Sequence, residues 1–202
     1  KDTGAAREIV GFGETAEKLA DAFWPGALTL VLPRLGDGLS PLVSAGLDTA
    51  AVRVPSHPAA QALLEAADLP VAAPSANRSG RVSPTAAGHV VFSLPGPGDG
   101  GPAMIVDGGP CLIGVESTVI DLSGDTPALL RPGGLEAEDI EAVIGPLETA
   151  EAAEPGKQGG AQKSPGQMDR HYAPDLPLRL DAEAPKPGEA FASNIPQLAL
   201  FP

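Results

Sequence analysis

Apolar and polar residues alternate along the chain in a pattern that predicts short strands separated by helices. Between residues 14 and 23 apolar side chains recur every three or four positions, which is the spacing of an amphipathic helix, and Pro25-Gly26 follows as a stop. Short apolar runs elsewhere, several of them closed by a proline, predict strands. These strands are expected at 28–32, 50–54, 71–73, 104–107, 117–121 and 128–130.

Three further helices are expected between these strands. Ser56 is placed to cap a helix with Pro58 in its first turn and a body at 59–67, and Ser83 is placed to cap another that runs to about residue 92. A last helix is expected at 136–144. Strands alternate both with helices and with direct links to the next strand, so the pattern predicts an α/β fold with a mixed sheet rather than a strictly parallel one.

Composition and charge narrow the binding partners and the cellular location that we expect for this protein. The 202 residues carry a formal net charge of −13, which disfavours broad binding to nucleic acid because that binding needs lysine and arginine to neutralise phosphates. No apolar run approaches the roughly 20 residues of a membrane span, and no signal peptide is visible. The single cysteine, Cys111, rules out an internal disulfide. We therefore expect a cytoplasmic protein without a membrane partner.

Residues 71–87 form the segment with the most suggestive chemistry. After a short apolar run come hydroxyl, amide and guanidinium side chains, among them Ser75, Asn77 and Ser83, and a helix is expected to follow. Backbone N–H groups at a helix start are unsatisfied and carry positive partial charge, so the arrangement is typical of an anion site and indicates a nucleotide phosphate. The alternative is a loop whose side chains satisfy only its own backbone.

Three other positions place charge or hydroxyl groups in or beside a strand. Arg53 lies inside an otherwise apolar strand, so it either faces solvent or binds an anion such as a carboxylate or phosphate. Arg131 precedes a Pro-Gly-Gly turn and either reaches into a cleft or stays on the surface. Glu116-Ser117-Thr118 is either a polar strand edge or a group that binds an amine or hydroxyl. No catalytic base or nucleophile is evident, so any chemistry would depend on positioning and charge stabilisation.

The composition changes after Gly145. Residues 148–162 are rich in alanine, glutamate and glycine without periodicity, which is linker composition. Residues 164–174 then restore varied side chains around the only tyrosine of the chain, Tyr172. A segment tethered in this way folds over a site as a lid or lies as an exposed turn. Residues 176–180 are expected to begin another strand.

Five segments that occur in order resemble one family. They read FWPGALTLVLP at 23–33, VRVP at 52–55, APSAN at 73–77, GGPCLIGVESTV at 108–119 and LRPG at 130–133. Together they resemble the YrdC-type L-threonylcarbamoyladenylate synthases, and SPGQMDRHYAP at 164–174 is similar to the linker of the long, two-domain form of that family. The resemblance implies a twisted, open α/β sheet with a concave face that binds ligands.

The same resemblance implies a reaction and its partners. L-threonine, bicarbonate or CO2, and ATP would be joined into threonylcarbamoyl-AMP with release of pyrophosphate, and Mg2+ is expected on the phosphates. A partner complex would then transfer the threonylcarbamoyl group to tRNA. The enzyme itself is therefore expected to bind nucleic acid weakly or not at all, in agreement with its acidic charge.

Roles for individual residues follow from the resemblance. Arg53, Ala73 and Ser117 match positions that bind threonine. The positions that match ATP-binding residues are Thr49, Ser75, Ser83, Arg131 and Tyr172.

The chain departs from the family pattern at its start. The strand and the Pro-Thr-Glu-Thr-type loop with which the family opens have no counterpart here. Residues 1–145 are therefore expected to form a catalytic domain that lacks its N-terminal part, 146–175 a linker or lid, and 176–202 the start of an incomplete C-terminal domain. A polypeptide of these residues alone is expected to be inactive and poorly soluble, because missing strands would expose a sheet edge and apolar surface.

Two other classes of protein stay open. A non-catalytic module for RNA binding or ribosome maturation on the same fold would bind duplex RNA in a salt-sensitive way, and the charge of −13 counts against it. An accessory domain that binds nucleotide and regulates a partner would be stabilised by its ligand without turning it over.

Overall fold

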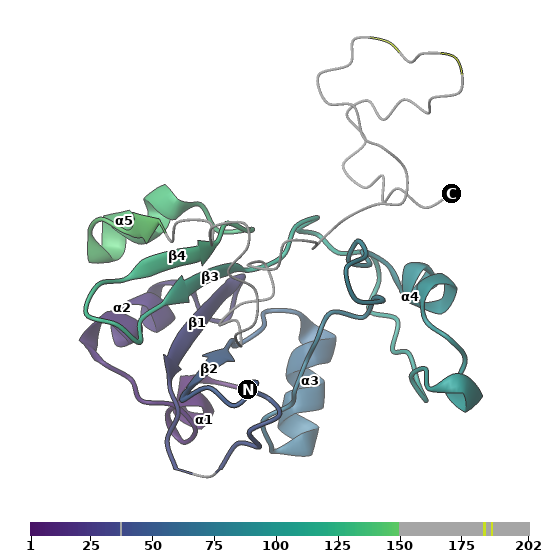
Figure 1. The fold of residues 1–202 in the computed structure, drawn as a ribbon, viewed down its shortest axis with the longest axis horizontal. Helices are drawn as coiled ribbons and strands as arrows, with labels where there is room; N and C mark the ends of the chain where they lie inside the picture. Colours follow the sequence, from purple (N-terminus) through teal and green to yellow (C-terminus); the bar gives the residue numbers. More distant parts are fainter. Residues whose placement is uncertain (37, 150–183, 185–186, 188–202) are drawn as a thin grey trace. The chain divides into compact units, whose positions relative to one another are not determined.

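The residues that the structure describes form two compact units. The computed structural model describes residues 1–36 and 38–149, together with 184 and 187. Within these residues, the first unit combines Lys1–Ala73 with 115–149, and the second combines Pro74–Gly114 with residues 184 and 187 (Figure 1). The predicted division of the chain at residues 145 and 175 stays a prediction, and the predicted strand at 176–180 lies outside the described residues.

A mixed sheet of five strands forms the centre of the first unit. Its strands are β1 (Leu28–Pro33), β2 (Thr49–Val52), β3 (Thr118–Asp121), β4 (Ala128–Arg131) and β5 (Glu148–Thr149). They lie in the order β2-β1-β3-β4-β5, with β1 antiparallel to β2 and parallel to β3, and β4 antiparallel to β3 and parallel to β5. The predicted α/β fold with a mixed sheet is therefore confirmed.

One face of this sheet carries the hydrophobic core. Helices α2 (Glu14–Phe23) and α5 (Ala137–Ile144) lie next to each other along the sheet (Figure 1). Leu28, Leu30 and Leu32 alternate along β1 and are buried in one cluster with Leu19 of α2 and Ile140 of α5. Because side chains of a strand alternate between its two faces, the residues between these leucines point to the opposite face.

The predicted helix at residues 14–23 forms with the same bounds, whereas neighbouring details differ from the sequence predictions. The first helix, α1 (Thr3–Arg7), was not predicted, although the Asp2 carboxylate caps it by accepting a bond from the Ala5 N–H at 2.7 Å. Helix α3 (Pro58–Ala67) is capped by the His57 ring nitrogen rather than by Ser56. None of the helices in the described ranges is long and apolar enough to cross a membrane.

The second unit contains less regular structure than the sequence predicts. Helix α4 (Ala87–Ser93) begins four residues after Ser83, and a single 3₁₀ turn follows at Pro97–Asp99. The Thr85 carbonyl accepts a bond from the Cys111 N–H at 2.8 Å, so this carbonyl is engaged by a distant segment rather than by the helix. The strands predicted at 71–73 and 104–107 do not form, because neither run has a partner strand among the described residues.

Candidate functional site

Strand register gathers several of the predicted residues at one end of the sheet of the first unit. Thr29 of β1 pairs with Val119 of β3, and Val119 pairs with Arg131 of β4, so these three residues form one row across the sheet. Arg53 follows directly on the end of β2 and continues this row beside β1. Since paired residues point to the same face, Thr29 and Arg131 project from the face away from the core.

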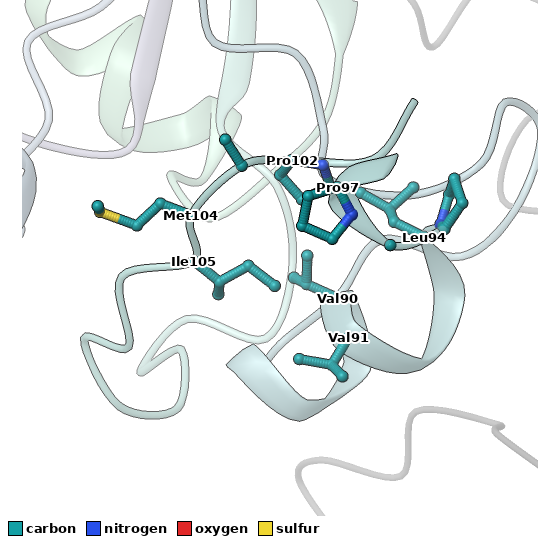
Figure 2. A pocket seen from close by; sticks show the side chains of 10 residues that line it. Val90, Val91, Leu94, Pro97, Pro102, Met104 and Ile105 are labelled. Carbon is teal, nitrogen blue, oxygen red and sulfur yellow. The ribbon is translucent and has the colours of Figure 1, made fainter. Parts of the chain in front are cut away.

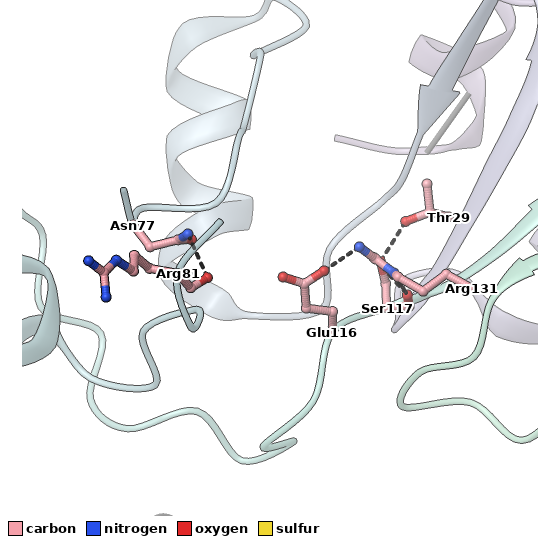
Figure 3. Close-up of polar contacts among 6 residues, drawn as sticks. All are labelled: Thr29, Asn77, Arg81, Glu116, Ser117 and Arg131. Atoms are coloured by element: carbon pink, nitrogen blue, oxygen red, sulfur yellow. Dashed lines mark hydrogen bonds and ion pairs between the residues drawn. The ribbon is translucent and has the colours of Figure 1, made fainter. Parts of the chain in front are cut away.

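A hydrogen-bond network converges on Ser117, the residue before β3 (Figure 3). Its hydroxyl lies 2.7 Å from the Thr29 hydroxyl, and its carbonyl oxygen accepts bonds from Nε and Nη2 of Arg131 at 3.2 and 2.8 Å. Nη2 of Arg131 also donates to the Ser117 hydroxyl at 3.2 Å. Because Ser117 is buried, these bonds fix the position of its hydroxyl. Thr29, Glu116, Ser117 and Arg131 are called the Ser117 network below.

Glu116 completes this network through an ion pair. Its carboxylate accepts a bond from Nη1 of Arg131, and the two side chains retain only 25% and 14% of their exposure. The pair is therefore shielded from water, where charge-assisted bonds hold their geometry better than exposed pairs do. Arg131 is consequently held on one side by a carboxylate and on the other by a backbone carbonyl.

The Pro-Gly-Gly turn after Arg131 packs directly against the backbone of the same segment. A Cβ atom added at Gly133 would lie 2.4 Å from the Glu116 carbonyl oxygen and equally close to backbone atoms of Ser117 and Thr118. The Gly134 N–H donates to the Glu116 carbonyl at 2.8 Å. Glycine is therefore required at position 133 for the close approach of two backbones, and this approach fixes Glu116 and Ser117 relative to Arg131.

Arg53 is the cation of this site that is open to a ligand. Arg53 is exposed as a whole residue, and its guanidinium forms no hydrogen bond or ion pair with another described residue. Nearby protein atoms nevertheless desolvate the guanidinium and lower its pKa, Arg131 lowers that pKa further, and Glu116 raises it. A guanidinium stays protonated at neutral pH despite such a shift, so Arg53 offers a positive charge and a planar set of donors.

Thr49 lies at the other end of the sheet. It begins β2 and pairs with Pro33, the last residue of β1, whereas Arg53 follows the opposite end of the same strand. The structure therefore does not bring Thr49 together with the Ser117 network. Its assignment to ATP stays a prediction.

The loop of the second unit is organised by its own side chains. The Asn77 amide donates to the carbonyls of Arg78 and Arg81 at 2.8 and 3.1 Å, and Figure 3 draws the bond to Arg81. Ser75 is exposed and Ser83 is partly buried, but neither lies at a helix start, because α4 begins only at Ala87. The predicted role of Ser83 as a helix cap is therefore wrong, whereas the assignment of both serines to ATP stays a prediction.

An apolar recess lies in the second unit beside α4 (Figure 2). Its volume is about 220 Å3, and its lining comes from Val90, Val91 and Leu94 on the helix side and from Met104 and Ile105 on the facing segment. None of the predicted site residues lines it. Its walls offer no charged group that would orient a polar substrate, so we do not assign it to the candidate site.

Two other predicted residues contribute less to the picture. Ala73 is exposed at the end of the first unit's leading segment and makes no polar side-chain contact, as its methyl group dictates. Tyr172 lies outside the described residues.

Thr29 was missed by sequence reasoning, although a threonine that interrupts alternating leucines in β1 marks a position on the face away from the core.

The geometry provides donors rather than acid-base groups. Guanidinium and hydroxyl groups from four neighbouring strands, β2, β1, β3 and β4, lie at the same end of the sheet, which suits a carboxylate or another small anion. Among the described residues there is no group of three histidine, cysteine, aspartate or glutamate side chains that could hold a metal ion.

Two family models match the chain. The model of the Sua5, YciO and YrdC proteins, described as telomere recombination, matches residues 1–133. A model described as the C-terminal domain of threonylcarbamoyl-AMP synthase matches residues 135–198. The first match alone covers more than half of the chain.

Relatives with curated names agree with these models. The threonylcarbamoyl-AMP synthases of Bacillus subtilis and Pyrococcus abyssi are 52% and 51% identical to this chain over 173 residues. Each alignment covers 86% of this chain, but only 48% and 49% of the respective relative. The chain thus spans about half the length of the curated relatives that it matches.

Solved structures show the same likeness. The crystal structure of Pyrococcus abyssi Sua5 complexed with L-threonine matches with a TM-score of 0.75 at 48% identity, over 84% of this chain and 48% of that chain. Escherichia coli YciO matches with a TM-score of 0.58 at 28% identity, over 66% of this chain and 63% of that one. The resemblance found in the sequence motifs is confirmed, and the chain belongs to the Sua5/YciO/YrdC family.

Proposed function

We propose that this chain carries part of an L-threonylcarbamoyladenylate synthase, which forms threonylcarbamoyl-AMP from L-threonine, bicarbonate or CO2, and ATP. The observation that carries the proposal is the position of Arg53, an open guanidinium that follows β2 at the end of the sheet where the Ser117 network lies and that interacts electrostatically with Glu116 and Arg131 of this network. Such a site suits the carboxylate and the polar groups of an amino acid. The name of the Pyrococcus abyssi relative and its complex with L-threonine support this assignment.

In this proposal Arg53, Ala73 and Ser117 bind threonine. Arg53 pairs with the substrate carboxylate, and the Ser117 hydroxyl, fixed by Thr29 and Arg131, bonds to a polar group of the amino acid. Ala73 contributes a small apolar wall. Each role keeps the substrate in one orientation, which is the main way in which positioning lowers a reaction barrier.

ATP is proposed to bind beside the threonine. Its ligands in this proposal are Thr49, Ser75, Ser83, Arg131 and Tyr172. Arg131 donates directly to Ser117, so the arginine proposed for the nucleotide and the serine proposed for threonine are already in contact. This contact would place the reacting groups of the two substrates close to each other.

The proposed chemistry needs no acid-base residue. A carboxylate oxygen of N-carboxy-threonine attacks the α-phosphorus of ATP, a P–O bond forms, and the bond to the β-phosphate breaks so that pyrophosphate leaves with its electron pair. Guanidinium groups stabilise the developing negative charge. Mg2+ is proposed to arrive on the ATP phosphates, where it keeps several waters, and we assign it no protein ligand among the described residues.

The test is pyrophosphate release by the full-length protein in a coupled assay. Release is expected to require ATP, threonine and bicarbonate together, and omission of either threonine or bicarbonate should lower it to background. Release that continues at the same rate without threonine would contradict the proposal. The product is proposed to pass in the cytoplasm to a complex that modifies tRNA, and the charge of −13 favours weak direct binding of RNA by this chain.

A further inference from the structure

Glu116 acts electrostatically on two arginines that have different surroundings. Its carboxylate pairs with Arg131, which is also bonded to the backbone and hydroxyl of Ser117. Arg53 has no such partner among the described residues. One carboxylate therefore forms an ion pair with Arg131 and also attracts the charge of Arg53. The three side chains together carry a single positive charge.

The geometry of the ion pair is imposed by the backbone. The Glu116 carbonyl accepts from the Gly134 N–H at 2.8 Å, and Gly133 packs against the same peptide, so the segment cannot move independently of the turn that follows Arg131. Glu116 and Arg131 are thus held face to face before any substrate arrives. Pre-arranged charges of this kind cost no reorganisation during the reaction.

The electrostatic effects on Arg53 agree with this placement. Desolvation and the charge of Arg131 both disfavour the protonated form of Arg53, and Glu116 opposes them. Without the carboxylate, two neighbouring guanidinium groups would repel each other and would together attract compact dianions such as phosphate. Glu116 thus sets which anions the pair of arginines attracts.

We propose that Glu116 is a positioning residue of the threonine site: its ion pair holds Arg131 on Ser117 and leaves Arg53 as the one guanidinium open to a substrate carboxylate. This inference rests on the proposed function. Glu116 touches Arg131 rather than the substrate, so its effect passes through that arginine. A consequence is selectivity for an amino acid carboxylate over inorganic phosphate at this place.

Two variants separate the charge of Glu116 from its contribution to packing. Glu116→Gln removes the charge with almost no change in shape, and Glu116→Asp keeps the charge but shortens the side chain by one methylene. The matched control is Glu17→Gln, because Glu17 of α2 also pairs with an arginine, Arg7, away from the site. Thermal unfolding of each variant would show that it is folded.

Titration calorimetry on the full-length protein would measure threonine binding with and without inorganic phosphate at constant ionic strength. For Glu116→Gln we expect the Kd of threonine to rise roughly tenfold, the size of effect typical of losing a charge-assisted bond, and phosphate to compete with threonine. Glu116→Asp should keep the insensitivity to phosphate, and Glu17→Gln should bind threonine as the unaltered chain does. If Glu116 had only a structural role, the loss of threonine binding in the two Glu116 variants would instead follow their loss of stability.

Several results would overturn the inference. These are an unchanged threonine Kd and no phosphate competition in folded Glu116→Gln, or equally strong phosphate competition in the unaltered chain. If Glu116→Gln does not fold, the aspartate variant decides, since phosphate competition there would contradict a role for the charge. A failure of the proposed function looks different, because the unaltered chain would then bind no threonine at all.

Discussion

At the residue scale, the candidate site combines a single open cation with a fixed hydroxyl. Arg131 is bonded to Glu116 and Ser117, whereas Arg53 has neither a carboxylate partner nor a hydrogen bond among the described residues. The pKa of Arg53 is lowered chiefly by desolvation, but a guanidinium is so basic that it remains charged at pH 7. Desolvation therefore strengthens its attraction for a carboxylate instead of discharging it.

Replacement of Arg53 tests this charge directly. Arg53→Ala should weaken threonine binding by about 2 kcal/mol, which is roughly a 30-fold rise in KM for threonine, because a charge-assisted bond is lost. Arg53→Lys should recover part of the effect, since it keeps the charge but not the planar pair of donors. Steady-state pyrophosphate release at varied threonine would give both values.

The control for Arg53 is Arg7→Ala, which removes an exposed guanidinium paired with Glu17. Its KM for threonine should match that of the unaltered protein. Full activity of Arg53→Ala at low threonine would remove Arg53 from the site.

The Thr29 hydroxyl is a second test at this scale. Thr29→Val keeps the shape of the side chain but deletes the hydroxyl that lies 2.7 Å from the Ser117 hydroxyl. We expect a loss of about 1 kcal/mol in the free energy of unfolding and weaker threonine binding, because Ser117 loses a partner. Urea unfolding and calorimetry would measure the two effects.

Thr15→Val is the matched control, since no hydrogen bond of the Thr15 hydroxyl occurs within the described part of the chain. It should leave threonine binding unchanged. If Thr29→Val and Thr15→Val bind threonine equally well, the Thr29 hydroxyl does not orient Ser117.

At the scale of elements, local patterns predicted what depends on neighbours in sequence and failed where a distant partner decides. The helix at 14–23 has its predicted bounds because periodicity and a Pro-Gly stop are local signals. The run at 104–107 has strand composition, but a strand also needs a partner, which composition does not specify. Helix α4 starts later than predicted, and the Thr85 carbonyl before it bonds to Cys111, 26 residues away in the sequence.

The site shows the same division between local and distant information. The chemistry of Arg53, Ser117 and Arg131 was evident in the sequence, because charged and hydroxyl residues interrupt apolar runs there. Their convergence depends on the order β2-β1-β3-β4, which joins segments more than 60 residues apart. Strand order could not be read from periodicity, and Thr29 gained significance only once it lay beside Ser117.

The turn after β4 provides a test at the element scale. In Gly133→Ala the new Cβ would lie 2.4 Å from the Glu116 carbonyl oxygen, so one of the two backbone segments must move. We expect a loss of about 3 kcal/mol in the free energy of unfolding and a clear fall in threonine affinity, because Glu116 and Ser117 shift together. Urea unfolding followed by calorimetry would measure both.

Gly124→Ala is the control for this change, because no atom lies within 4 Å of its added Cβ. Its free energy of unfolding should stay within about 0.5 kcal/mol of the original value. Equal effects of the two substitutions on the free energy of unfolding would show that the close backbone contact at Gly133 does not make alanine costly there.

At the scale of the whole molecule, a local positive site lies in a strongly acidic chain. The net charge of −13 repels extended polyanions, whereas Arg53 attracts a small anion at short range. Broad RNA binding and binding of an amino acid carboxylate are therefore separated by charge. This distinction favours the proposed enzyme over the RNA-binding alternative.

Stability of the whole chain in the presence of ligand tests the distinction. Threonine at 100 times its Kd should add about 2.7 kcal/mol to the free energy of unfolding, because only the folded chain binds it. For a chain of this size that corresponds to a rise of roughly 5–10 °C in Tm, measurable by differential scanning calorimetry. With a roughly 30-fold weaker affinity, Arg53→Ala should reduce this gain to about 0.9 kcal/mol at the same threonine concentration. Duplex RNA should raise Tm little even at low salt, since the acidic surface repels it. A large rise with RNA and none with threonine would reverse the ranking of the two functions.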